Sequence, residues 1–154
     1  MKDNFVHLTN YAINKNNKKF IFNKDEGNMD KGHKRSVSFV YRYLAKKGVN
    51  VTELKQKIEN MIVKTLLIGQ PMLSHVYHLS QPDNVSNDLV FHILGFDVLI
   101  TEKYEPVLLE INHTPSFSID TPLDKKIKKN LIKDTLKILN VNVESKKEKI
   151  SKKM

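Results

Sequence analysis

The sequence predicts an α+β protein in which helices pack against an antiparallel sheet. Three segments, residues 36–47, 52–68 and 121–139, carry apolar side chains at helical spacing. Two apolar runs, residues 89–101 and 106–112, read as strands, and the short connection between them favours antiparallel pairing. A chain of 154 residues with 40% hydrophobic and 28% charged residues is long enough to enclose one hydrophobic core.

The first part of the chain is predicted to contain an extended segment, a long loop and a helix. Residues 5–14 alternate between two faces, as a strand does. Residues 15–35 are polar and contain two glycines, so we expect a loop, and loops of this length are usually functional or mobile. The helix over residues 36–47 is expected to stop at Gly48.

The second predicted helix begins with Thr52 as its N-cap and continues to about Ile68. Gly69 and Pro71 follow and are expected to end it. Residues 72–88 are then predicted to be irregular, with a turn in the sequence Gln-Pro-Asp-Asn.

The last predicted helix has Thr121 as its N-cap and Pro122 as its first helical residue, and it runs to about Leu139. We expect one domain over residues 1–140. The charged remainder, residues 141–154, is predicted to be a basic, disordered tail.

The composition excludes several classes of site. The chain has no cysteine, so it has no disulfide or thiolate metal site, and any metal must be bound by oxygen or imidazole. No apolar run approaches the roughly 20 residues of a membrane span. The first ten residues do not resemble a secretory signal. We therefore expect an intracellular, cytoplasmic protein.

The formal net charge of +9 has two explanations. It favours an acidic partner, such as nucleic acid, an anionic membrane surface, an acidic protein tail or a nucleotide. It is also what a biased composition produces, because the chain is rich in Lys and Asn and has only two arginines. The charge alone does not decide between them.

Both predicted strands contain an acid at a position where a core residue is expected. If the centre of the hairpin falls near Lys103–Tyr104, Asp97 lies opposite Glu110, with their Cβ atoms about 4.5–5.5 Å apart. Gly95 then lies opposite Asn112, which shares a face with Glu110 because strand side chains alternate. Three oxygen-bearing side chains therefore gather on one patch.

Two like charges placed opposite each other repel, and a divalent cation removes this repulsion. Two carboxylates and a carboxamide, supplemented by water and phosphate, suit Mg²⁺. Alternatively, lysines neutralise both acids on a solvated sheet face. The neighbouring His113 can contact a substrate or cap the strand end. Thr9 and Asn10 can bind phosphate or metal-bound water, or simply form a turn.

Five motifs occur along the chain in a recognisable order: HLTNYAINK, GHKRS, LGFDVLI, LLEINHTPSF and TPLDKKIKKNLIKDTLKIL. With these motifs the chain resembles the tubulin–tyrosine ligase-like family, and most closely its tubulin polyglutamylases. The resemblance covers about residues 5–140. It implies the C-terminal half of a catalytic domain with the ATP-grasp fold, which joins an amino acid to a protein carboxylate using ATP and Mg²⁺.

The resemblance also implies roles for individual residues, and it assigns no catalytic side chain beyond the metal and substrate ligands. The implied residues are Asp97, Glu110 and Asn112 for Mg²⁺, Thr9 and Asn10 for the nucleotide, and Tyr11, Lys34 and His113 for the incoming acidic amino acid.

The implied reaction is polyglutamylation of tubulin. A carboxylate of an acceptor glutamate attacks the γ-phosphate of ATP, and the amino group of free glutamate then displaces phosphate from the acylphosphate. The implied partners are the acidic C-terminal tails of tubulin, microtubules and free glutamate, and not nucleic acid or a membrane. The implied location is the cytoskeleton, with the cilium, axoneme and basal body as candidates. The basic face of the last helix can attract an acidic tail or can be an ordinary solvated lysine face.

Some features depart from the family pattern. Ala12 replaces a serine that polyglutamylases often carry, and His92 occupies a position that is usually acidic. The family's upstream lysines for ATP and its substrate arginine do not precede Met1 in this sequence. We therefore expect a truncated fragment with little or no ligase activity of its own. The alternatives are a non-catalytic microtubule-binding module and a family ligase that adds glycine or tyrosine.

Overall fold

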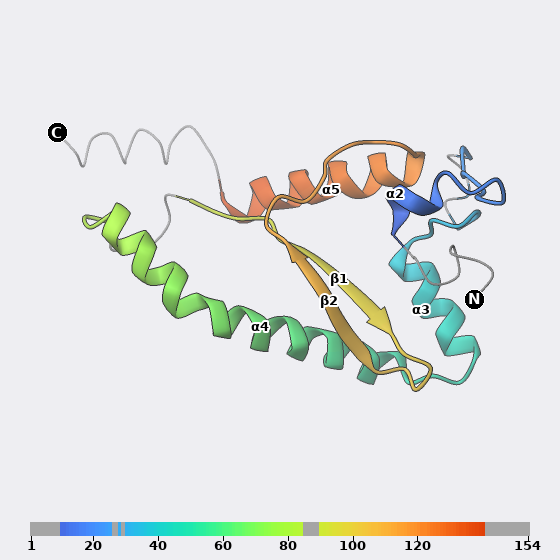
Figure 1. Ribbon diagram of the computed structural model, residues 1–154, viewed down its shortest axis with the longest axis horizontal. Helices are drawn as coiled ribbons and strands as arrows, with labels where there is room; N and C mark the ends of the chain where they lie inside the picture. Colours follow the sequence, from blue (N-terminus) through green and yellow to red (C-terminus); the bar gives the residue numbers. More distant parts are fainter. Residues whose placement is uncertain (1–9, 26–27, 29, 85–89, 141–154) are drawn as a thin grey trace. The chain divides into compact units, whose positions relative to one another are not determined.

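The computed structural model describes residues 10–25, 28, 30–84 and 90–140, and its helices and strands confirm the predicted α+β class (Figure 1). The elements in chain order are α2 (Tyr11–Asn14), α3 (Val37–Lys46), α4 (Val51–Ser80), β1 (Gly95–Ile100), β2 (Pro106–Asn112) and α5 (Pro122–Ile138).

The chain divides into two compact units, each of which is described by itself. The first unit takes in the described residues up to Phe39 and those from Phe117 onward, and so holds α2 and α5. The second unit, Val40–Ser116, holds most of α3, all of α4 and the hairpin of β1 and β2. The boundary therefore falls inside α3.

The predicted hairpin is confirmed, because β1 and β2 form a two-stranded antiparallel sheet. The connection is closed by hydrogen bonds from the Thr101 amide to the Glu105 carbonyl and from the Tyr104 amide to the Thr101 carbonyl, both 2.9 Å long. Tyr104 adopts a φ of 60°, in the left-handed region that such a tight reversal requires.

A β-bulge in the hairpin decides which residues face each other. On the side nearer the connection, Val98 pairs with Leu108. The next residue of β1, Asp97, pairs with Glu110. Leu109 is therefore an extra residue on β2, and without it Asp97 would lie opposite a leucine. The predicted pairing of the two acids is correct, but a bulge rather than a symmetric connection produces it.

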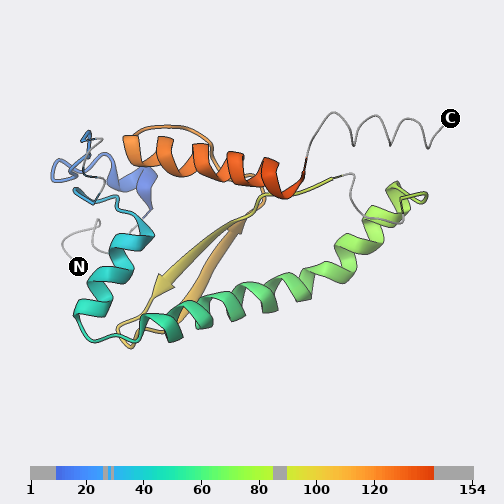
Figure 2. The ribbon, with the colours of Figure 1, turned by 180° about the vertical axis from the view of Figure 1, so that it is seen from behind.

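The helix α4 contacts β2 inside the second unit (Figures 1 and 2). Leu54, near the start of the helix, is only 2% exposed and is one of two buried apolar side chains in the described part of the chain. Lys57 lies 2.9 Å from Glu53 of the same helix and 2.6 Å from Glu105, so an ion pair connects the helix to the end of the hairpin.

The predicted bounds of this helix are wrong at both ends. Its N-cap is Asn50 and not Thr52, because the Asn50 side chain accepts a hydrogen bond of 3.1 Å from the amide of Glu53. The helix also continues through Gly69 and Pro71 to Ser80. Pro71 removes one hydrogen bond and does not end the helix. The predicted turn after it is present, since residues 82 and 83 form one.

The predicted helix over residues 36–47 is confirmed as α3, and it stops where the sequence indicates. Gly48 has a φ of 83°, and its amide donates to the carbonyl of Ala45. The amide of Val49 donates to the carbonyl of Leu44 at 3.1 Å. This arrangement closes the helix with a glycine in the left-handed conformation.

In the first unit, the predicted extended segment is wrong where the structure describes it. Tyr11–Asn14 form one helical turn, because the Asn10 side chain caps the amide of Ala12 at 2.8 Å. The loop that follows is closed by two hydrogen bonds between His33 and Ile21. The Ile21 amide donates to Nδ1 of His33 at 3.0 Å, and the His33 amide donates to the Ile21 carbonyl at 3.2 Å.

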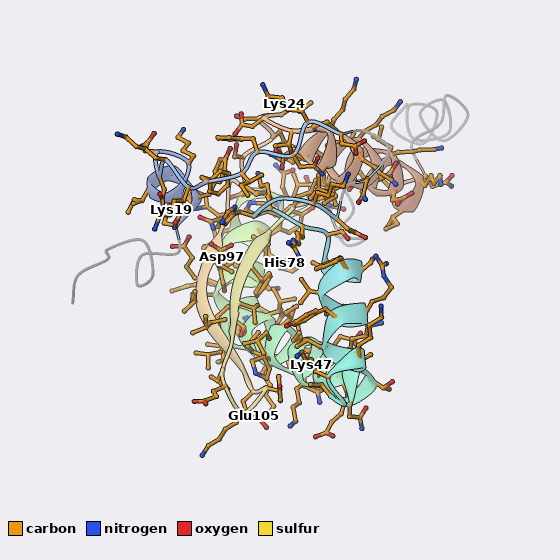
Figure 3. The ribbon with its side chains drawn as sticks, turned by 90° about the vertical axis from the view of Figure 1, so that its right-hand side faces the viewer. Lys19, Lys24, Lys47, His78, Asp97 and Glu105 are labelled. Atoms are coloured by element: carbon orange, nitrogen blue, oxygen red, sulfur yellow. The ribbon has the colours of Figure 1, made fainter. Side chains whose placement is uncertain are left out.

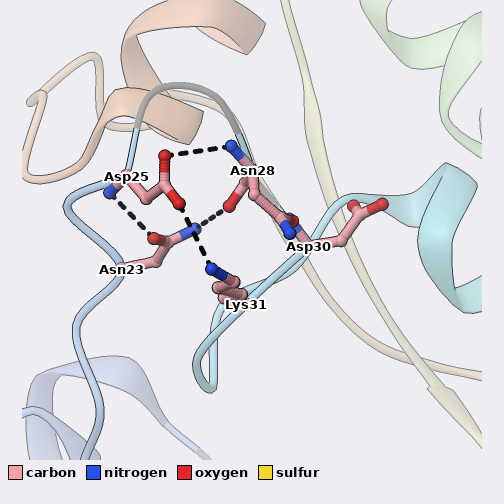
Figure 4. A network of polar contacts seen from close by, with 5 residues as sticks. All are labelled: Asn23, Asp25, Asn28, Asp30 and Lys31. Carbon is pink, nitrogen blue, oxygen red and sulfur yellow. Dashed lines mark hydrogen bonds and ion pairs between the residues drawn. The ribbon is translucent and has the colours of Figure 1, made fainter.

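The tip of this loop holds itself together through short polar contacts (Figure 4). Asp25 accepts from the amide of Asn28 and pairs with Lys31 at 3.3 Å. The Asn23 side chain accepts from the Asp25 amide and donates to the Asn28 carbonyl. These contacts join the two sides of the loop.

The start of α5 is as predicted. Thr121 is the N-cap, Pro122 occupies the first turn, and Thr121 and Asp124 form a capping box. Leu123 is 5% exposed. The predicted tail, residues 141–154, lies outside the described residues, so its disorder stays a prediction.

The second half of α4 carries an exposed apolar face. Ile68 is 83% exposed, and Met72, Leu73 and Leu79 are each 70% exposed. Among the helices of the described residues, none is long and apolar enough to cross a membrane.

Candidate functional site

The predicted metal residues lie together on the hairpin. Asp97 is paired with Glu110, and Gly95 is paired with Asn112. The Asn112 side-chain nitrogen donates to Oε1 of Glu110 at 3.2 Å, so the carboxamide lies beside the carboxylates. Figure 3 shows Asp97 toward one end of the hairpin and Glu105 at the other end, by the connection. The structure therefore brings the three predicted ligands together.

Gly95 provides room beside this patch. A Cβ atom at position 95 would lie 3.3 Å from Cβ of Pro115 and 3.5 Å from Cβ of Asn112. A side chain at position 95 would therefore crowd Pro115, whereas its Cβ would lie at an ordinary van der Waals distance from Asn112. The glycine allows the start of β1 to pass close to Pro115, which follows β2.

Asp97, Glu110 and Asn112 form a group that we call the acid patch. Within the described part of the chain, every lysine salt bridge involves a carboxylate outside this patch, so no lysine neutralises its charge. Partial desolvation raises the pKa of Asp97, and a hydrogen bond to Glu110 and the charge of Glu110 raise it further. The two carboxyl groups therefore favour sharing a proton or a cation. This argues against the alternative of lysine pairs on a solvated sheet face.

The donor chemistry of the patch fits Mg²⁺, which prefers oxygen ligands and keeps several waters. Among the described residues, no group of three or more His, Asp or Glu side chains could hold a metal ion, so the patch offers only two carboxylates and the carboxamide. Such a set leaves coordination positions for phosphate and water.

His113 follows directly after β2, and its backbone carbonyl accepts a hydrogen bond from Nε2 of His92. His92, which departs from the family pattern, thus fixes the backbone next to Asn112. An acidic side chain at position 92 could not donate this bond when ionised. His92 therefore contacts the backbone next to the candidate ligands, and its departure from the family pattern is the only signal of this contact in the sequence.

Two predicted substrate residues, Tyr11 and Lys34, meet in the first unit. Nζ of Lys34 lies 4.2 Å from the centre of the Tyr11 ring, at the distance of a cation–π contact. The same ammonium group is 2.8 Å from Oδ1 of Asp124. Tyr11 also donates its hydroxyl to Asp120, and its pKa is raised, first by desolvation and then by that bond.

Asp124 and Asp120 are residues that sequence reasoning missed. The spacing of Thr121 and Asp124 indicates a capping box, but it does not reveal a contact with Lys34, which is 90 positions away in the chain. Burial by itself would raise the pKa of Asp124, but hydrogen bonds from Lys34 and Thr121 outweigh it, and the pKa is lowered. Asp124 is therefore an ionised carboxylate in the folded chain.

The predicted nucleotide residues are only partly described. Thr9 lies outside the described residues. Asn10 is exposed, and its side chain caps α2. The alternative of a local structural role is therefore realised for Asn10, while a nucleotide contact stays a prediction.

Comparison with known proteins places these motifs in one family. The model of the family described as "Tubulin-tyrosine ligase family" matches residues 1–151. The chain belongs to the tubulin–tyrosine ligase family. The predicted resemblance is confirmed by this match and by similarity to proteins described as tubulin polyglutamylases.

Three relatives of this family member illustrate the similarity. A protein of Tetrahymena thermophila, described as a probable beta-tubulin polyglutamylase, is 49% identical over 151 residues, which are 98% of this chain and 13% of the relative. Tubulin polyglutamylase TTLL6 of Homo sapiens is 41% identical, over 92% of this chain and 15% of the relative. Tubulin polyglutamylase TTLL7 of Mus musculus is 37% identical, over 96% of this chain and 16% of the relative. This chain thus spans less than one fifth of the length of each.

Proposed function

We propose that this member of the family supplies the Mg²⁺-binding part of a tubulin polyglutamylase active site with an ATP-grasp fold. The reaction is the ATP-dependent joining of glutamate to glutamate side chains in tubulin tails. The observation that carries the proposal is the pairing of Asp97 with Glu110, beside Asn112, with no lysine partner in the described part of the chain. The similarity to polyglutamylases supplies the substrate class.

In this proposal Asp97, Glu110 and Asn112 hold the metal, which neutralises charge on the phosphates of ATP when it is bound. The bulge at Leu109 places both carboxylates on one face of the hairpin. The pairing of the two strands places these ligands side by side. Positioning and electrostatics, rather than covalent work by the protein, are the contributions of these residues.

The residues proposed to contact the incoming amino acid are Tyr11 and Lys34 in the first unit and His113 in the second, as the resemblance to the family implies. Lys34 provides a positive charge for a carboxylate of free glutamate. The Tyr11 ring lies against the same ammonium group and limits its movement. Thr9 and Asn10 complete the proposal as nucleotide contacts. The expected place of action is the cytoskeleton, including the cilium, axoneme and basal body.

The test is a chimera in which this chain replaces the matching part of mouse TTLL7, so that the complete catalytic domain surrounds it. We expect the chimera to incorporate labelled glutamate into tubulin. Asp97→Ala and Glu110→Gln are expected to abolish incorporation and to weaken binding of Mg²⁺–nucleotide. Glu102→Gln, in the connection of the same hairpin, is the matched control and should leave both unchanged.

Three results would contradict the proposal: an inactive chimera that folds and binds nucleotide, unchanged nucleotide binding in both acid variants, or preferential incorporation of glycine or tyrosine. The 154-residue chain alone is expected to show little or no incorporation, and robust activity of that chain would contradict the expectation of a fragment.

A second candidate is a non-catalytic module that binds microtubules through α5. The exposed lysines of this helix include Lys125, Lys129 and Lys133, which recur at every fourth position and so share a face. A microtubule pelleting assay at increasing salt tests this surface. If removal of the acidic tubulin tails leaves pelleting unchanged, the basic face is not the binding surface.

A further inference from the structure

The ammonium group of Lys34 is held from two sides within the first unit. Its Nζ lies 2.8 Å from Oδ1 of Asp124 and 4.2 Å from the centre of the Tyr11 ring. The side chain of Lys34 is 36% exposed, whereas that of Asp124 is 8% exposed. The lysine therefore has one buried anionic partner and one aromatic partner, and it still reaches solvent.

Asp124 itself is fixed by the start of α5. Its Oδ2 atom accepts from the Thr121 hydroxyl at 2.9 Å and from the Thr121 amide at 3.1 Å. The Asp124 amide donates to the Thr121 hydroxyl at 3.2 Å. One carboxylate oxygen thus caps the helix, and the other holds Lys34. Because the cap is part of a 17-residue helix, the anchor of Lys34 has little freedom.

We propose that Asp124 is a positioning residue that holds the Lys34 ammonium group against Tyr11 and presents its remaining N–H donors to the carboxylate of an acidic amino-acid substrate. This inference rests on the proposed function. An ammonium group has three donors, and Asp124 uses one of them at its Oδ1 atom. The exposure of Lys34 leaves the others accessible to a substrate from solvent.

The charge of Asp124 does not by itself repel such a substrate. Lys34 and Lys128 both lower the pKa of Asp124 through their charges, so two cations act on the one buried carboxylate. The positive end of the α5 dipole adds to them. Lys128 is in turn held by a hydrogen bond to the carbonyl of Ser118.

The first test measures the position of Lys34 in the chain itself by NMR. A lysine methylene close to an aromatic ring face has an upfield proton shift. We expect the Lys34 CεH₂ signal to be shifted upfield in the wild-type chain and to return toward the ordinary value in Asp124→Asn. The matched control is Asp134→Asn, on the same helix, which removes an exposed partner of Lys137 at 3.3 Å. It should leave the Lys34 signal unchanged.

A second variant, Asp124→Glu, separates movement of Lys34 from disruption of the start of α5. Asp124→Glu keeps a capping box, since glutamate is favoured at this position, but its carboxylate extends one methylene further. The α5 amide signals should then persist while the Lys34 signal moves. A Lys34 signal that is unchanged in both Asp124 variants overturns the positioning role, whatever the chain does as an enzyme.

The second test uses the TTLL7 chimera described above. Asp124→Asn is expected to raise the KM for glutamate about tenfold, with a smaller effect on kcat and none on the KM for ATP, because a misplaced lysine weakens only the amino-acid contact. A loss of kcat with both KM values unchanged would overturn the inference. An inactive wild-type chimera would count against the proposed function alone, because the NMR result stands independently.

Discussion

The pair of acids on the hairpin, Asp97 and Glu110, leads to a prediction about stability. Replacing Asp97 by Asn should change the stability of the hairpin in opposite directions without and with Mg²⁺. In Asp97→Asn the charge opposite Glu110 is removed while the shape of the side chain is kept. Like charges at directly opposite positions destabilise a sheet by about 0.2–1 kcal/mol. Both side chains are exposed, so screening places the effect in the lower half of that range, about 0.3–0.5 kcal/mol. Without metal, the variant hairpin should therefore be slightly more stable than the wild type.

With Mg²⁺ present, the wild-type hairpin should be more stable than the Asp97→Asn hairpin. A cation that binds only the folded hairpin stabilises it by about 1.4 kcal/mol at roughly ten times its Kd. The variant has lost one of its two carboxylates and should gain little.

Amide hydrogen exchange in β1 and β2 measures both effects, because it reports local opening. In EDTA, exchange in Asp97→Asn should be up to about twofold slower than in the wild type. At roughly ten times the Kd for Mg²⁺ the wild type should become about tenfold slower and the variant should barely change. Glu102→Gln should behave as the wild type in both conditions. Faster exchange of Asp97→Asn in EDTA, or equal protection of both proteins by Mg²⁺, would refute the reasoning.

Three further predictions concern the frame around the site. Gly32→Ala should lower the free energy of opening the loop by about 2–3 kcal/mol, because Gly32 has a φ of 78° and a Cβ would lie 2.6 Å from the backbone oxygen of Ile21. The amide of His33 should then lose protection from hydrogen exchange, which checks the prediction. Leu54→Ala should lower the free energy of unfolding of the second unit by about 2–3 kcal/mol, as measured in urea, because Leu54 is buried. Ile68 is 83% exposed, so Ile68→Ala should change that free energy by no more than about 0.5 kcal/mol. Equal effects of the two substitutions would contradict the burial of Leu54. Because the pKa of Asp124 is lowered, its ion pair with Lys34 stabilises the fold fully above the ordinary carboxyl pKa and less as the pH falls below about 4. In that acidic range, amides in the first turn of α5 should lose protection from hydrogen exchange. Unchanged protection in acid would count against the ion pair.

Features that depend on a few neighbouring residues could be predicted from the sequence. Thr121 followed by Pro122 identifies the start of α5, and Gly48 identifies the end of α3. The positions of Asp97 and Glu110 in two strands joined by a short connection predict correctly that they pair, although the bulge at Leu109 that produces this pairing is not predicted. In each case the deciding interactions are local or span a single hairpin.

Features decided by competition between signals are predicted incorrectly. Pro71 indicates the end of α4, but apolar residues at helical spacing, Met72, Val76 and Leu79, follow it, and the helix continues. The capping contact of Asn10 favours a helical turn over the strand that alternation suggests. The pairing of Lys34 with Asp124 depends on the folded path of the chain, and no sequence pattern marks it.

The extra leucine in β2 has a consequence for comparing relatives. The bulge at Leu109 moves the partner of Asp97 by one position, which is the same shift that one additional residue in the connection would cause. A relative with a longer connection and no bulge can therefore face the same two acids toward each other. The length of the connection is then a poor guide to whether a relative keeps the acid pair, and alignments of this region should be anchored on the two carboxylates instead of on the residues between them.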